Sequence, residues 1–328
     1  MITYSNMKTF RIENVNPIIR DAVVEKINNL NKPLHALGRL ETLALQICMV
    51  QQKLSPTLHH PVHLLFGGDH GIEIEGVSKS PRQVTWQQMK NFANGGGGVN
   101  VFARQHGFDL KLVDVGVDHD LSDESRILNR KINPGTRNFL YDAAMTQKEF
   151  DRAIEVGRQL VWDAYNDGAD IISIGEMGVG NTSPSSIWMS LMGHLGLHEC
   201  VGAGSGLNAW ETEHKLNVLT KAVERFQHNH PGADTETIIR YFGGYEMVAA
   251  IGAMLRAAEL NILILVDGFI MTACMLAASQ LYPAVLDRAI FSHCGDEAGH
   301  QRMLALMNAQ PLLHLGLKLG EGTGALIA

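Results

Sequence analysis

The sequence repeats one pattern five times: a short apolar run that passes directly into a loop with chemically useful residues. The five runs are 61–66, 109–113, 169–174, 261–266 and 288–292. Four of the loops combine glycine with a carboxylate, and the fifth begins with His293. Short β-branched runs that alternate with helical segments predict a parallel sheet with helices on both faces. Because the carboxyl ends of parallel strands share one edge, we expect a ligand site where these loops meet.

The first sixty residues carry helical rather than strand patterns. Asn16 is a plausible N-cap with Pro17 at the first helical position, and apolar residues recur at helical spacing over 18–30. A second amphipathic helix is predicted over 37–52. Further along, Thr146 and Glu149 form a capping-box pattern that predicts a helix running to about Asn166.

Composition excludes several classes of protein. The chain has 328 residues, a net charge of −7 and no long basic run, so it lacks the footprint of a nucleic-acid-binding protein. No apolar run has membrane-spanning length, and the N-terminus lacks a signal-peptide pattern, so we expect a cytoplasmic protein.

Cysteine and histidine spacing gives no metal-binding pattern. Cys48 and Cys274 lie in apolar helical runs, which favours buried core thiols. The densest histidine cluster, His59, His60 and His63, matches no ligand motif, and we expect these to be loop and strand-edge histidines. We therefore predict no metal site.

Two glycine-rich loops are candidates for phosphate binding. The loop 175–182 precedes a predicted helix start, where free amides attract anions, but it has no P-loop lysine. The loop 202–208 contains a weak dinucleotide-type match beginning at Gly204 and has no good strand before it. Lys215, on the next predicted helix, is either a phosphate counter-charge or a solvated helix lysine.

Two carboxylates complete the candidate site. Asp267 ends a very apolar strand, so it needs a buried partner or a ligand, and a ribose would suit it. Glu321 lies among glycines in the segment 316–324, either as a substrate-facing group or as a solvated turn residue. Phosphate-binding loops, a carboxylate suited to a sugar and a separate glutamate together favour glycosidic-bond chemistry on a nucleotide.

The chain resembles the nicotinate-nucleotide–dimethylbenzimidazole phosphoribosyltransferase family along nearly its whole length. The most specific matching stretches are GEMGVGNT at 175–182 and LGLKLGEGTGA at 315–325. Further collinear matches are KPLHALGRLE at 32–41, 68–88, 114–117, 202–207, 242–246, 266–269 and 291–293.

The resemblance implies a fold, an assembly and a reaction. The expected fold is a large Rossmann-like α/β domain at 61–328, with a small helical domain at 1–60 that C-terminal residues complete. The family is homodimeric, so a homodimer is expected. Its reaction moves phosphoribose from nicotinate mononucleotide to a benzimidazole nitrogen, releases nicotinate and needs no metal or other cofactor. The partners implied are therefore small-molecule substrates.

The resemblance also assigns roles residue by residue. Glu321 matches the general base, which takes the benzimidazole N–H proton. The residues matching the base pocket are Ser80, Gln88, Glu176, Met177 and Leu319. Those matching the phosphate and ribose side, with further nucleotide contacts, are Gly178, Gly180, Asn181, Gly204, Ser205, Gly206, Lys215, Asp267 and Ser292.

Two departures and three alternatives accompany this assignment. The chain has His35-Ala36 where the family usually has Gly-Ser, and it stops at Ala328 where relatives continue, so we expect a truncated chain or a shorter member.

The nearest alternative is transfer to a phenolic base or adenine. The second alternative is a non-catalytic subunit, and the intact loop around Glu321 argues against it. The third is a nicotinamide-dependent dehydrogenase, and the missing strand before Gly202 argues against it.

Overall fold

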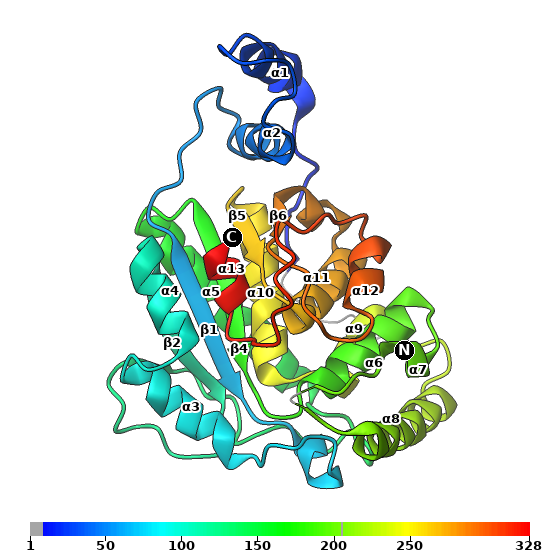
Figure 1. Ribbon diagram of the computed structural model, residues 1–328. Coiled ribbons are helices and arrows are strands. Elements are labelled where there is room, and N and C mark those ends of the chain that lie inside the picture. The colour runs from blue at the N-terminus through cyan, green and yellow to red at the C-terminus, as the bar shows by residue number, and fades with distance from the viewer. Residues whose placement is uncertain (1–8, 205) are drawn as a thin grey trace.

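A six-stranded, wholly parallel sheet forms the centre of the computed structural model, which describes residues 9–204 and 206–328 (Figure 1). The strands are β1 (Val62–Gly68), β2 (Asp109–Gly116), β3 (Ile127–Asn129), β4 (Ile171–Met177), β5 (Leu263–Val266) and β6 (Ala289–Phe291). Their spatial order is β3-β2-β1-β4-β5-β6, which is the Rossmann order. The order reverses between β1 and β4, so the loops that follow these two strands diverge and leave room for a ligand.

The helices occupy the connections between strands, as the alternation in the sequence predicts. The α-helices are α1 (Arg20–Asn28), α2 (Arg39–Gln51), α3 (Gln83–Ala93), α4 (Gly98–His106), α5 (Gln147–Asn166), α6 (Thr182–Gly193), α7 (Leu197–Cys200), α8 (Ala209–Asn229), α9 (Thr235–Phe242), α10 (Tyr245–Glu259), α11 (Phe269–Leu281), α12 (His300–Leu306) and α13 (Thr323–Ile327). Three 3₁₀ helices are η1 (Pro17–Ile19), η2 (Gly71–Glu75) and η3 (Pro283–Arg288).

Alternate residues of each strand enter different cores on the two faces of the sheet. Leu64 and Phe66 pack into the large core that also contains α5, α10 and α11. Leu65 faces the opposite way, into a smaller core with α3, α4 and Leu326 of α13. Because both faces are covered, β1 is buried throughout, as expected for a central parallel strand.

Several local predictions are confirmed. The Asn16 side chain accepts a hydrogen bond from the Ile18 amide, with Pro17 at the first position of η1. Thr146 and Glu149 form the expected capping box at the start of α5, which ends at Asn166. Cys48 and Cys274 are buried.

Three predictions are wrong or incomplete. His63 is not a loop or strand-edge histidine; it is fully buried in the central strand β1. Glu176 and Met177 belong to β4 rather than to the loop after it. The edge strand β3 was not predicted, because Ile127–Asn129 is short, ends in a polar residue and is only partly buried, so it forms no apolar run.

The helices α1 and α2 stand apart from the sheet and its covering helices at the top of Figure 1. Leu43 and Ile47 of α2 pack beside Leu312, so part of the C-terminal segment does reach this unit. The last helix, α13, instead packs on α4 and β4. Among residues 9–204 and 206–328, no helix combines the length and apolar character needed to cross a bilayer.

Candidate active site

Glu321 lies in a tight turn directly before α13, on the face of the sheet that α3 and α4 cover. Its φ is +67°, a left-handed conformation that a residue with a side chain seldom adopts. One carboxylate oxygen accepts a hydrogen bond from the Val99 amide at the start of α4 (3.4 Å). The side chain is only 8% exposed, so Glu321 is not a solvated turn residue. Burial raises the pKa of Glu321 above its usual value.

Glu176 is the second buried carboxylate of the site and lies near the end of β4, close to the same turn. A Cβ added to Gly320 would sit 2.5 Å from Glu176 Oε1, so the turn passes directly beside this carboxyl and a larger residue would displace it. Its other oxygen accepts a hydrogen bond from the Asn181 side-chain amide. Burial, followed by the nearby Glu246, Asp267 and Glu321 carboxylates, raises the pKa of Glu176 to about 8.

A buried histidine–carboxylate pair lies beneath the loop that follows β4. His70 Nε2 is 2.6 Å from Glu246 Oε1, and both side chains are almost completely buried. A Cβ on Gly178 would approach both side chains to 3.2 Å and the Gly68 carbonyl oxygen to 2.5 Å. The loop therefore rests directly on this pair, and glycine is required at that position.

The loop from Gly178 to Asn181 leads into α6 and faces a buried lysine. Gly180 has a φ of +94°, and Asn181 is the N-cap of α6. Lys215 Nζ donates to Thr182 Oγ1 (2.8 Å) and to the Gly202 carbonyl (3.4 Å), so it joins both predicted phosphate loops. Lys215 is fully buried, which is inconsistent with a solvated helix lysine. Burial lowers its pKa to about 8.

The second glycine loop, 202–208, surrounds the Lys215 ammonium group only in part. Gly204, with a φ of +54°, lies next to Lys215 and Thr182, and a Cβ there would be 3.1 Å from Thr182 Oγ1. Gly206 is exposed, and Ser205 lies outside the described residues. The stretch before this loop contains the short helix α7 rather than a strand, so the dinucleotide-type match lacks its βα context.

Asp267 already has protein partners. Its Oδ1 accepts a hydrogen bond from the Ala325 amide of α13 (2.9 Å) and lies 3.3 Å from His293 Nε2. Asp267 therefore fixes the start of α13, which closely follows Glu321. Ser292 donates its hydroxyl to the Val266 carbonyl (2.6 Å), which ties the end of β6 to β5.

The remaining residues of the predicted base pocket come from three parts of the chain: the segment before Glu321, the end of β4, and α3 with the residues before it. A Cβ on Gly98 would meet Leu319 Cδ2 at 3.2 Å and Glu321 Oε2 at 3.7 Å, so Leu319, 48% exposed, borders the turn. Met177 follows Glu176 and is half-buried. Ser80 precedes α3, and Gln88 on α3 accepts from the Asn91 side chain (3.1 Å). The Val179 amide donates to Thr85 Oγ1 of α3 (3.1 Å), which joins this helix to the loop after β4.

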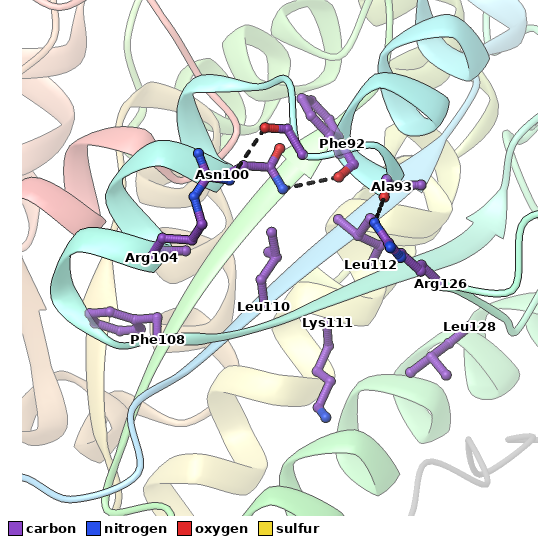
Figure 2. A pocket seen from close by; sticks show the side chains of 12 residues that line it. Phe92, Ala93, Asn100, Arg104, Phe108, Leu110, Lys111, Leu112, Arg126 and Leu128 are labelled. Carbon is purple, nitrogen blue, oxygen red and sulfur yellow. Dashed lines mark hydrogen bonds between the residues drawn. The ribbon is translucent and has the colours of Figure 1, made fainter.

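One cavity of about 470 Å³ lies elsewhere, between α4 and the outer part of the sheet (Figure 2). Its apolar floor includes Leu110, Leu112 and Leu128. Two of its cations already have protein partners: Arg126 donates to the Ala93 carbonyl (2.8 Å) and Arg104 to the Gly95 carbonyl (3.3 Å). This cavity is therefore a poorer phosphate site than the β1–β4 edge, where a glycine loop, a helix start and Lys215 meet.

The chain is similar to known proteins along nearly its whole length. A family model described as "Phosphoribosyltransferase" matches residues 12–328. The chain belongs to this family. A nicotinate-nucleotide–dimethylbenzimidazole phosphoribosyltransferase from Bacteroides fragilis is 57% identical over 320 residues, which cover 98% of this chain and 92% of the relative. A protein of the same name from Phocaeicola vulgatus is 55% identical over 322 residues, with the same coverage. The crystal structure of CobT from Thermus thermophilus superposes with a TM-score of 0.91 at 34% identity, covering 95% of this chain and 92% of that one.

Sequence reasoning about this phosphoribosyltransferase assigned no role to three buried groups. They are His63, His70 and Glu246, none more than 1% exposed. A single histidine or glutamate in the sequence gives no sign of its burial, because burial depends on which helices cover the strands. The only available signal was that His70 and Glu246 fall within the stretches that match the family. Within the described parts of the chain, no group of three or more His, Cys, Asp or Glu side chains is arranged to hold a metal ion.

Proposed function

We propose that this chain transfers phosphoribose from nicotinate mononucleotide to 5,6-dimethylbenzimidazole, giving α-ribazole 5′-phosphate and nicotinate. One observation carries the proposal: two buried carboxylates of raised pKa, Glu321 and Glu176, lie at the same strand edge as a glycine loop joined to a buried lysine. The names of the relatives from Bacteroides fragilis and Phocaeicola vulgatus support the choice of donor and acceptor.

In the proposed reaction, Glu321 acts as the general base. A benzimidazole nitrogen attacks C1′ of the ribose while the C1′–nitrogen bond to nicotinate breaks, and nicotinate leaves with the bonding electron pair. Glu321 accepts the proton from the other benzimidazole nitrogen. A carboxylate with a raised pKa suits this task near neutrality, because a base works best when its pKa lies close to the working pH. Attack and departure on opposite faces of the sugar invert C1′.

The remaining site residues are assigned to binding. Ser80, Gln88, Glu176, Met177 and Leu319 are proposed to surround the base. Gly178, Gly180, Asn181, Gly204, Ser205, Gly206 and Lys215 are proposed to hold the phosphate and ribose. Asp267 and Ser292 are proposed as nucleotide contacts, although both already have protein partners, so we assign them mainly to shaping the site. No metal or other cofactor is needed, because binding and proton transfer account for the reaction.

We further propose a cytoplasmic homodimer with a helical unit at 1–60 and a catalytic unit at 61–328. Exposed apolar side chains concentrated on the helical unit support this assembly, because a monomer seldom leaves such a patch in water. They include Ile18, Leu30, Leu34, Leu37 and Leu40, which are 49–77% exposed.

The deciding experiment is an end-point assay of the purified protein. It would be incubated with nicotinate mononucleotide and, separately, 5,6-dimethylbenzimidazole, adenine or p-cresol, and the products would be read by mass spectrometry. We expect riboside phosphate from the benzimidazole in the highest yield. Product from p-cresol or adenine alone would change the acceptor. Failure of every base while the mononucleotide still binds would reject the transferase activity in favour of a non-catalytic subunit.

A further inference from the structure

His63 forms a buried link between the sheet and the turn that carries Glu321. Its side chain leaves β1 on the face covered by α3, α4 and α13, and none of it is exposed. Nε2 lies 3.0 Å from the Glu321 carbonyl oxygen, and Nδ1 lies 2.9 Å from Ser173 Oγ on the neighbouring strand β4. The link therefore runs from Ser173 through the imidazole to the backbone of Glu321.

The chemistry of the two partners fixes how the proton is placed in this link. A carbonyl oxygen can only accept a hydrogen bond, so Nε2 must carry the proton and donate it to Glu321. In the neutral ring, Nδ1 is then an acceptor, and the Ser173 hydroxyl donates to it. Burial lowers the pKa of His63 to about 4, so the ring is neutral under ordinary conditions. Every polar group of the link is thereby satisfied with a single tautomer.

The link acts on a residue whose backbone conformation is unfavourable. A left-handed φ at a residue with a side chain is unfavourable and persists only when neighbouring groups enforce it. Glu321 has that conformation, with a φ of +67°. Its carbonyl is enclosed from two sides: a Cβ on Gly175 would lie 2.4 Å from the Glu321 oxygen, and a Cβ on Gly322 would lie 2.0 Å from His63 Cε1.

We propose that His63, oriented by Ser173, is a positioning residue that holds the Glu321 backbone in its left-handed conformation and so keeps the carboxylate aimed at the reacting base. This inference rests on the proposed function, because it requires Glu321 to act in turnover. His63 itself touches neither substrate, so its effect should pass entirely through Glu321.

The test compares two substitutions at His63 with and without the Glu321 carboxylate. His63→Leu fills similar space but cannot donate, and we expect kcat to fall on the order of a hundredfold, as small misplacements of a reacting group do. The KM for nicotinate mononucleotide should change little. His63→Gln, whose amide nitrogen can donate to the same carbonyl, should recover most of the loss. In a Glu321→Gln background, where turnover is measured by long end-point incubations, adding His63→Leu should lower turnover by less than about threefold. The carboxylate that His63 positions is already absent there.

The controls separate positioning from folding. Phe150→Leu, in the large core away from the site, supplies a variant of similar thermal destabilisation that should retain kcat. A ¹⁵N spectrum of the wild-type histidines should show His63 protonated on Nε2. Full additivity of His63→Leu with Glu321→Gln, or an Nδ1-protonated ring, would overturn the proposal while wild-type turnover persists. Absence of turnover in the wild type with every base would instead reject the proposed function and this inference with it.

Discussion

At the scale of single residues, the two carboxylates of the site, Glu321 and Glu176, differ in their surroundings and therefore in their pKa values. Glu321 accepts one long hydrogen bond from the Val99 amide, and its pKa is raised mainly by burial. Glu176 is also buried but has Glu246, Asp267 and Glu321 around it, and its pKa reaches about 8. Two acids whose environments move their pKa values apart can hold different protonation states at one pH. We therefore assign proton acceptance to Glu321 and hydrogen-bond donation to Glu176.

The first prediction concerns the base. Glu321→Gln removes the proton acceptor but preserves the size of the side chain, so we expect turnover to fall on the order of a hundredfold or more. Binding of nicotinate mononucleotide, measured by calorimetry, should be nearly unchanged because the phosphate loop and Lys215 are intact. Unchanged turnover in this variant would remove Glu321 from the mechanism.

The second prediction concerns the pH profile of turnover. Because the pKa of Glu176 is about 8, its carboxyl donates a hydrogen bond below that pH and loses the ability above it. We expect kcat at saturating mononucleotide to decline as pH rises through about 8, and Glu176→Gln, which still donates, to lack that decline. Lys215 also has a pKa of about 8, but bound phosphate would stabilise its charged form. Its titration should therefore change kcat/KM rather than kcat at saturating mononucleotide. A decline in kcat that persists in Glu176→Gln would assign it to another group.

The same residue couples stability to pH. The folded protein binds a proton at Glu176 up to about pH 8, whereas the unfolded chain loses it near the ordinary value of 4.5. The stabilisation is complete below the unfolded pKa and is lost as pH rises through the folded one. As pH rises from 5 to 9, the melting temperature of wild type should therefore fall relative to that of Glu176→Gln. A constant difference across that range would contradict the raised pKa.

At the scale of elements, α5 and α10 pack unusually closely because each presents a glycine to the other. A Cβ on Gly157 of α5 would lie 1.8 Å from the Ala249 carbonyl oxygen, and one on Gly252 of α10 would lie 2.2 Å from that of Ile154. The helix α10, which this contact holds close to α5, also contributes Glu246 to the pair with His70 beneath the loop that follows β4.

The prediction for this contact is that alanine destabilises despite its helix propensity. Gly157→Ala gains about 1 kcal/mol of propensity but forces a methyl group against backbone, and overpacking typically costs about 1–3 kcal/mol or more. We expect a net loss of stability in urea unfolding. Gln159→Ala, exposed on the same helix, is the matched control and should change the free energy of unfolding by less than about 0.5 kcal/mol. Equal stabilities for the two variants would contradict the close packing.

Strand and helix positions could be predicted from the sequence largely because local pattern decides them. The runs that became β1, β2, β4, β5 and β6 are short and apolar, and the cap at Thr146 is a local hydrogen-bond pattern. Glu321 and the loop after β4 could be proposed as site residues because a glycine-flanked charge and a helix start leave a local pattern, and Lys215 only because it follows a glycine loop. The role of His63 could not be found, because it depends on contact with a residue 258 positions later.

At the scale of the whole molecule, the helical unit formed by α1 and α2 is the part least covered by the rest of the described chain. Leu34 and Leu40 are 65% and 61% exposed, and Figure 1 shows α1 at the far end of this unit, with α2 between it and the sheet. Val50 at the end of α2 is buried against β5 and β6, so the unit is attached along one side only.

The prediction for this surface is self-association. Wild-type protein should sediment as a dimer, and the double substitution Leu34→Asp with Leu40→Asp should shift it towards the monomer, because charge on a buried apolar interface is costly. Tyr141→Asp, at a site 57% exposed on the main body, is the control and should leave the dimer intact. A monomeric wild type would contradict the proposed assembly.

The link between His63 and Glu321 also orders events during synthesis. The ribosome produces the central strands, the glycine loop and Lys215 before Glu321, the proposed general base. A nascent chain, or one clipped before Gly320, would carry the loop proposed to bind the phosphate without the proposed general base. On this proposal, the reaction centre is complete only when the turn before α13 has docked against His63 of β1.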